Sequence, residues 1–129
     1  MDDDDAAILD RLAIIENVLN SVKIRIPDIQ GLVVVTKDGL PIAASLDSRV
    51  DEDRISAMTA ASLNLAERVV IELNRGELSE MIIKGVDGLV IIMDAGEEAV
   101  LTGITHSDAK LGLVLLDMKR AAKKLSELI

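Results

Sequence analysis

Two uninterrupted apolar runs constrain the fold of this chain more than any other feature. One covers residues 32–35 (LVVV) and the other residues 89–93 (LVIIM). Successive side chains of a strand point to opposite faces of a sheet, so a strand that is apolar at every position has to be covered on both faces. The sequence therefore predicts at least two strands that are buried on both sides.

Short turns connect the strands that the sequence predicts. Strands are expected over residues 32–35, 42–46, 78–84, 89–93 and 100–105, with turns at 37–39, 86–88 and 95–97. Such short turns leave no room for a crossover, so the strands that they join have to be antiparallel. Pro41 precedes the second predicted strand, which favours a position at an edge of the sheet.

Three helices are expected around these strands. The first covers about residues 6–22 and ends before Pro27, the second covers residues 51–74, and the third covers about residues 108–128. One of the aspartates at positions 2–5 is expected to cap the first helix, and Asp51 or Ser48 the second. The element order is α-β-β-α-β-β-β-α in one domain of residues 1–129, with Met1 to about Asp5 as a flexible acidic terminus.

The second helix has apolar or small residues on two sides, and at 1.5 Å per residue it is about 35 Å long. One stripe, expected to pack on the sheet, contains Ile55, Met58, Leu65, Ala66, Val69, Val70 and Leu73. The other side, expected to meet a partner, contains Ala57, Ala60, Ala61, Asn64 and Ile71, with Arg68 beside them. An alternative interpretation stays open, because alanine is also a good helix former on a solvated face.

The composition argues against nucleic-acid partners. Lys and Arg total 14 against 23 Asp and Glu, which gives a net charge of −9. Binding to a phosphate backbone depends on clustered positive charge, and single-stranded nucleic acids are held by stacking on aromatic side chains. The sequence contains no Phe, Tyr or Trp. We therefore expect no binding of nucleic acid.

The sequence also favours a cytoplasmic protein. It has no cysteine, so it forms neither disulfides nor thiolate zinc sites. No apolar run approaches the roughly 18 residues that span a bilayer. The aspartates at positions 2–5 carry the wrong charge for the basic region of a secretory signal. We expect a reducing compartment and no direct insertion into a membrane.

No pattern of residues indicates catalysis. The phosphate-binding patterns G-x-x-x-x-G-K-S/T and G-x-G-x-x-G are absent. His106 is the single histidine, which is too few for a zinc site of the usual kind or for a recognisable catalytic set. Glu72, Glu77 and Glu80 surround one turn, but without the spacing of a known magnesium site. We expect no catalytic residues, no metal and no cofactor, and no enzyme activity.

A basic cluster on the last predicted helix has two interpretations. Lys119, Arg120, Lys123 and Lys124 share one face of that helix. They form either a solvated face or a contact for an acidic partner. Their place near the carboxyl end of a helix is favourable in both cases, because the helix dipole is negative there.

The order of the elements and several motifs resemble the roadblock (dynein light chain) family. The similarity extends over about residues 8–128. It is carried by residues 29–35 (IQGLVVV), residues 38–43 (DGLPIA), the alanine-containing helix, and residues 85–105 leading into Lys110-Leu111-Gly112. None of these motifs is a catalytic signature, so the resemblance depends on the ordered set.

This resemblance implies an α+β fold, a five-stranded antiparallel sheet with helices on both faces. It also implies a homodimer in which the long helices pack together through Ala57, Ala60, Ala61, Asn64, Arg68 and Ile71. The third strands would pair at their edges, through Leu78, Met81 and Ile83.

The family's roles imply a small GTPase as the partner. We expect a non-catalytic homodimeric regulator or adaptor that binds a Ras-like small GTPase. The alternative is a structural scaffold subunit of a larger complex that is indifferent to nucleotide. A small-ligand sensor is a third hypothesis, which the aliphatic strands do little to support.

Overall fold

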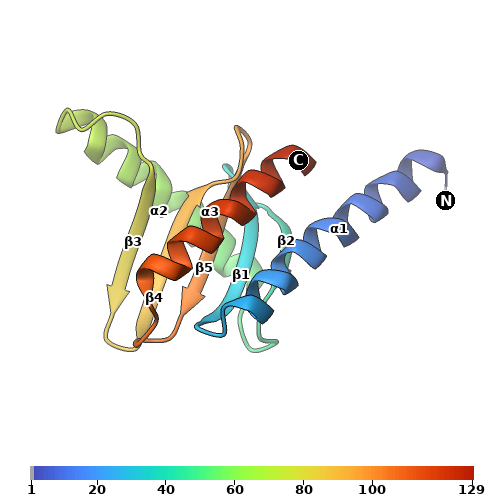
Figure 1. Cartoon of the computed structure of the whole chain (residues 1–129). Coiled ribbons are helices and arrows are strands. Elements are labelled where there is room, and N and C mark those ends of the chain that lie inside the picture. The colour runs from blue at the N-terminus through green and yellow to red at the C-terminus, as the bar shows by residue number, and fades with distance from the viewer. Residues whose placement is uncertain (1) are drawn as a thin grey trace.

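Five antiparallel strands form one sheet in the computed structural model, which describes residues 2–129 (Figure 1). The strands are β1 (Ile29–Thr36), β2 (Pro41–Ser45), β3 (Glu80–Gly85), β4 (Gly88–Asp94) and β5 (Ala99–Thr105). The helices are α1 (Asp3–Arg25), α2 (Glu52–Glu72) and α3 (Leu111–Leu128). The predicted α+β architecture and the predicted element order are confirmed.

The strands lie in the order β2-β1-β5-β4-β3. Strands β1 and β5 pair along most of their lengths at the centre, with Val33 opposite Thr102 and Val35 opposite Val100. Strands β2 and β3 form the two edges, so the edge position that Pro41 predicts is confirmed. The apolar runs fall in β1 and β4, the two strands that flank β5.

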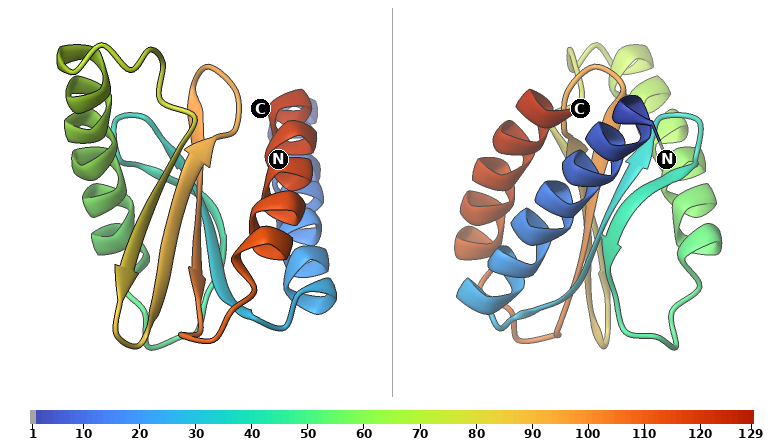
Figure 2. Two further views of the ribbon diagram at one scale, coloured as in Figure 1. Left: turned by 60° about the vertical axis from the view of Figure 1, so that its left-hand side comes forward. Right: turned by 90° about the vertical axis from the view of Figure 1, so that its right-hand side faces the viewer.

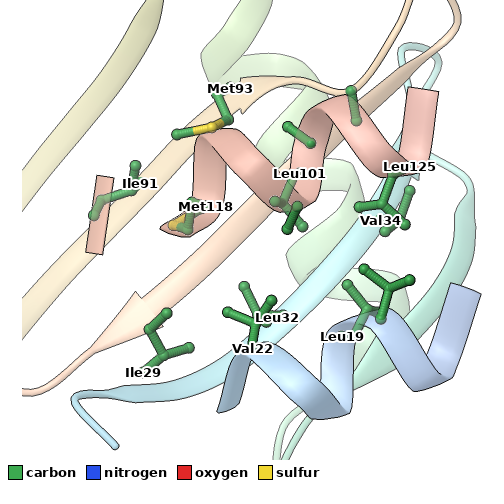
Figure 3. Close-up of a cluster of buried hydrophobic side chains, with 14 of the residues drawn as sticks. Leu19, Val22, Ile29, Leu32, Val34, Ile91, Met93, Leu101, Met118 and Leu125 are labelled. Carbon is green, nitrogen blue, oxygen red and sulfur yellow. The ribbon is translucent and has the colours of Figure 1, made fainter. Parts of the chain in front are cut away.

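Helices cover both faces of the sheet, α1 and α3 on one face and α2 on the other (Figure 2). The main core lies on the α1 and α3 side, where Leu32 and Val34 of β1 meet buried residues of both helices (Figure 3). Arg25 of α1 also donates two hydrogen bonds to the carboxylate of Asp117 of α3, at 3.2 and 3.4 Å. This face is therefore well filled and held together by a part-buried ion pair.

The core on the α2 side is much smaller. Its fully buried members are Leu63, Ile92 and Val100, with Leu78, Met81 and Val90 partly buried against them. The remaining contact of α2 with the sheet uses small side chains. Thr59 and Thr102 share a buried hydrogen bond of 3.1 Å between their hydroxyls, and Ala60 lies against the β1–β2 turn at Gly39. Gly39 has a φ of +96°, a conformation that suits glycine and leaves room for the helix.

Both predicted helix caps are present. The side chain of Asp2 accepts a hydrogen bond from the backbone N–H of Asp5 at 2.9 Å, and Asp51 accepts one from the N–H of Arg54 at 3.1 Å. Residues 3–5 form the first turn of α1, where the helix dipole favours carboxylates, so this part of the chain is helical in the structure. Met1 lies outside the described residues.

Several predicted boundaries shift by a few residues. Helix α1 continues to Arg25 because the chain turns only at Pro27. Strand β3 starts at Glu80 and not at Leu78, since residues 73–79 are needed to bring the chain from the end of α2 back to the sheet. Helix α3 starts at Leu111 and not near Asp108, because the backbone N–H of Lys110 is held by the carboxylate of Asp28 at 3.1 Å.

The hydroxyl pair between α2 and β5 gives a test of how α2 is held. Replacing either Thr59 or Thr102 by valine leaves the other hydroxyl buried without its partner, which costs about 1–3 kcal/mol. Replacing both removes both polar groups. We therefore expect the double variant to lose less unfolding free energy than the two single variants lose together. Denaturant unfolding followed by circular dichroism measures this; additive losses would contradict the importance of the pair.

Candidate protein interaction surface

Helix α2 carries large apolar side chains on the side that faces away from the sheet. Met58, Leu65 and Leu73 are 60%, 62% and 63% exposed, and Val69 is 47% exposed. Together with exposed Ala61 they recur every three or four residues, so they lie along one side of the helix. We call Met58, Ala61, Leu65, Val69 and Leu73 the α2 stripe. A water-soluble monomer has no structural need for such a stripe.

This arrangement corrects the predicted orientation of the helix. The residues of α2 that are buried against the sheet are Ser56, Thr59, Ala60 and Leu63. Met58, Leu65, Val69 and Leu73 are therefore not packed on the sheet, and Ala60 is not on the outer face. The physical reason is the close approach of α2 to the β1–β2 turn and to Thr102, which admits small side chains and excludes long ones.

The other residues that the sequence singled out on this helix are exposed. They are Ala57, Ala61, Asn64, Arg68 and Ile71. Arg68 lies 3.9 Å from Glu72 in an exposed ion pair one turn along the helix. Ala61 is a member of the α2 stripe, while Ala57, Asn64 and Arg68 flank it.

The second feature of this surface is the free edge of β3. Strand β3 pairs with β4 on one side only, and Ile82 and Ile83 are 41% and 42% exposed. Met81 and Ile83 pair with Ile92 and Val90, so they share the α2 side of the sheet. Leu78, also predicted for this edge, lies before the strand and packs on the small core. A short apolar strand with unpaired backbone groups is a template for pairing with another strand.

The α2 stripe and the β3 edge lie on neighbouring parts of the molecule. The carboxyl-terminal part of α2 lies on the same side of the molecule as β3 (Figure 1). A hollow of about 650 Å³ separates this part of the helix from the sheet. Its lining is Glu67, Val70, Ile71, Asn74, Gly76, Glu77, Leu78 and Asp94. The chain therefore leaves the space between the carboxyl-terminal end of α2 and the sheet incompletely filled.

Two arginines in the loops before and after α2 make hydrogen bonds within those loops. Hydrogen bonds from the side chain and backbone of Arg49 lower the pKa of Asp47 to about 2. Arg75 donates to the carbonyl of Leu73 at 2.9 Å. Among residues 2–129, no group of three or more His, Cys, Asp and Glu side chains is arranged to hold a metal ion. None of the described helices has the length and apolar composition of a bilayer-spanning segment.

Two adjacent alanines test which side of α2 faces the sheet. Ala60 is 8% exposed, whereas Ala61 is exposed. We expect Ala60→Arg to destabilise the fold by about 3 kcal/mol or more, because it forces an unpaired charge against the β1–β2 turn. Ala61→Arg keeps the helix content, because its side chain extends away from the sheet. Circular dichroism of both variants is the measurement, and equal losses would contradict this orientation of α2.

Known proteins with this fold are found by sequence and by structure. A family model described as the Roadblock/LC7 domain matches residues 14–105. The uncharacterized protein MJ1340 of Methanocaldococcus jannaschii is 41% identical over 97 residues, which are 75% of this chain and 84% of that protein.

Two solved structures are similar over most of the chain. The structure of MglB with a tetrameric arrangement has a TM-score of 0.83 and 20% identity, over 92% of this chain and 89% of that one. The Roadblock/LC7 domain from Streptomyces avermitilis has a TM-score of 0.82 and 16% identity, over 87% and 94% of the two chains. At these identities the structures establish the fold, while the family model and the sequence relative each extend over more than two thirds of the chain. The chain therefore belongs to the Roadblock/LC7 domain family.

Proposed function

We propose that this protein is a non-catalytic, homodimeric regulator or adaptor that binds a Ras-like small GTPase. The observation that carries the proposal is the exposed α2 stripe beside the free edge of β3, in a chain of this family. Members of the family implied by the resemblance serve as partners of such GTPases or as subunits of larger assemblies. The lack of cysteine suits a reducing cytoplasm, where we place the protein.

The dimer that we propose uses one surface patch twice. In a two-fold contact the same residues face each other, so the α2 stripe of each copy packs against the stripe of the other. The β3 edges then lie close enough to pair and to join two sheets into one. Both apolar features are covered in this way, and the strand edge no longer presents unpaired backbone groups. The tetrameric arrangement of MglB is consistent with self-association in this fold.

The GTPase would be bound as a folded partner and regulated without a catalytic group from this protein. When the α2 stripes of two copies pack together, the paired α2 helices form a broad surface. Exposed Ala57, Asn64 and Arg68 flank this surface. Any stimulation of hydrolysis would then come from repositioning the GTPase's own residues. The arginines to examine against this view are Arg49, Arg54, Arg68 and Arg75, since an inserted arginine accelerates hydrolysis by about 10³–10⁵.

Charges placed on the α2 stripe test the dimer. We expect the double variant Leu65→Glu and Val69→Glu to run at a lower mass than the parent protein, because facing carboxylates would be buried without partners. Leu116→Glu on α3 is the control, since this leucine is also 48% exposed but lies on the other side of the sheet. Light scattering with refractive-index detection suits a chain without aromatic residues. A double variant that keeps the mass of the parent protein would refute the interface.

Nucleotide dependence tests the GTPase partner. The protein, immobilised at its carboxyl end, is incubated with host lysate in the presence of GDP or of a non-hydrolysable GTP analogue. We expect a small GTPase to be enriched in one of the two states, and the Leu65→Glu and Val69→Glu variant to lose it. Equal recovery of large-complex subunits in both states, without a GTPase, would favour the nucleotide-indifferent scaffold instead.

A further inference from the structure

Helices α1 and α3 cover the face of the sheet opposite to α2 (Figure 2). A basic groove lies between these two helices. Its volume is about 380 Å³ and its lining is Ile14, Asn17, Val18, Ser21, Arg25, Arg120, Ala121 and Lys124. Three of these residues are cationic and none is acidic. Arg25 is paired with Asp117, while Arg120 and Lys124 have no ion-pair partner among residues 2–129. The net charge of the chain is −9, but this groove is positively charged. Its charge therefore favours an anionic occupant.

The amino-terminal part of α1 is acidic and projects away from the core. Ile15 is the first residue of this helix that is buried, and Ile8 and Leu9 are 57% and 53% exposed. The helix extends beyond the sheet towards the amino terminus (Figure 1). Five aspartates, at positions 2, 3, 4, 5 and 10, lie in this projecting part or at its cap.

One side of α1 has opposite charges at its two ends. Its exposed members are Asp3, Ala7, Asp10, Ile14, Asn17, Ser21 and Arg25, which recur every three or four residues. Ile14 is 48% exposed and lies at the middle, 11 residues from Asp3 and 11 from Arg25 (14 − 3 = 25 − 14 = 11). At 1.5 Å per residue, each end is about 16 Å from Ile14.

We propose that two copies of the chain pack their α1 helices antiparallel, so that the acidic end of each lies in the basic groove of the other. With Ile14 facing Ile14 at the two-fold axis, the equal offsets bring Asp3 of one copy opposite Arg25 of the other. Ala7 and Ser21 then face each other, and both are small enough for close approach of the helices. Asp10 faces the part of the groove formed by Val18, where Arg120 and Lys124 supply the positive charge.

The second copy is the occupant because its own sequence supplies every complementary feature at the required spacing. A two-fold contact needs a self-complementary surface, and a helix side that is acidic at one end, basic at the other and apolar at the centre meets that need. The same contact supports the projecting turns of α1, which have little packing within their own chain.

This contact leaves the α2 stripe free, since α1 and α2 cover opposite faces of the sheet. Together with the α2 dimer of the proposed function, on which this step rests, it links dimers into a four-chain ring or an open filament, depending on closure. The α1 contact itself does not depend on the α2 dimer.

Charge reversal and mixing test the contact in full-length protein that carries Leu65→Glu and Val69→Glu. One variant adds Arg120→Glu and Lys124→Glu, and the other adds Asp3→Lys and Asp10→Lys. We expect the background protein to form two-chain particles at micromolar concentration, and each charge-reversed protein to run as one chain. An equimolar mixture of the two restores the two-chain mass, because each acidic end then has a basic groove and each basic end an acidic groove. A misfolded variant would not be rescued by mixing, and circular dichroism checks the helix content.

Lys123→Glu is the matched control for Lys124→Glu, because the two lysines are adjacent and exposed but lie on opposite flanks of α3. We expect Lys124→Glu to raise the dissociation constant by about tenfold or more, and Lys123→Glu to leave it unchanged. Equal effects of the two, a background protein that is one chain throughout, or a mixture that stays at one chain would overturn the inference. A two-chain mass that persists when Arg120→Glu and Lys124→Glu are added would also overturn the inference, because the contact would then not depend on the basic groove.

Discussion

The architecture of this protein depends on the need to cover a sheet whose central strands are apolar on both faces. Val33, Val35 and their partners on β5 point towards α2, while Leu32 and Val34 point towards α1 and α3. Neither set of side chains can be left in water without losing the burial that stabilises the fold. Two helices fill one face, but a single helix has to cover the other. The unequal filling of the two faces is the origin of the α2 stripe.

Helix α2 covers its face of the sheet by approaching the strands closely. Small side chains face the strands, and a hydroxyl pair between Thr59 and Thr102 satisfies the polar groups that this packing buries. Close approach has a consequence for the rest of the helix, because its larger side chains do not fit beneath it and lie outward. The small side chains that let α2 pack closely on its own sheet therefore leave the large apolar side chains on the outer side, where a second protein can cover them.

The two helical faces also have different characters. The α2 side presents aliphatic side chains and a strand edge, a combination suited to a dry and permanent contact. The α1 and α3 side presents opposite charges at defined positions around one isoleucine, which favours orientation and register more than affinity. A chain with these two faces has the means for two distinct self-contacts, one on each side of the sheet.

The candidate site was only partly predictable from the sequence. The presence of apolar residues on two sides of α2 follows from the pattern, the edge position of β3 was implied by the family resemblance, and the structure has both. The orientation of the helix does not follow, since a helical wheel that gives weight to large apolar residues selects Met58, Leu65, Val69 and Leu73 as core. Ala60 is buried because of the turn at Gly39, a contact that no periodicity within the helix reveals.

The sequence by itself determined the elements of this protein, their order and their antiparallel connections, because turn length, capping residues and apolar periodicity act over a few neighbouring positions. It also placed the strand that begins at Pro41 at an edge of the sheet. The tertiary structure alone decided which side of α2 meets the sheet and which side chains line the groove between α1 and α3. Arg25 and Asp117 are 92 positions apart in the chain. Their contact, like that of Ala60 with Gly39, depends on how helices settle on a sheet assembled from distant strands, and local patterns contain no information on that fit.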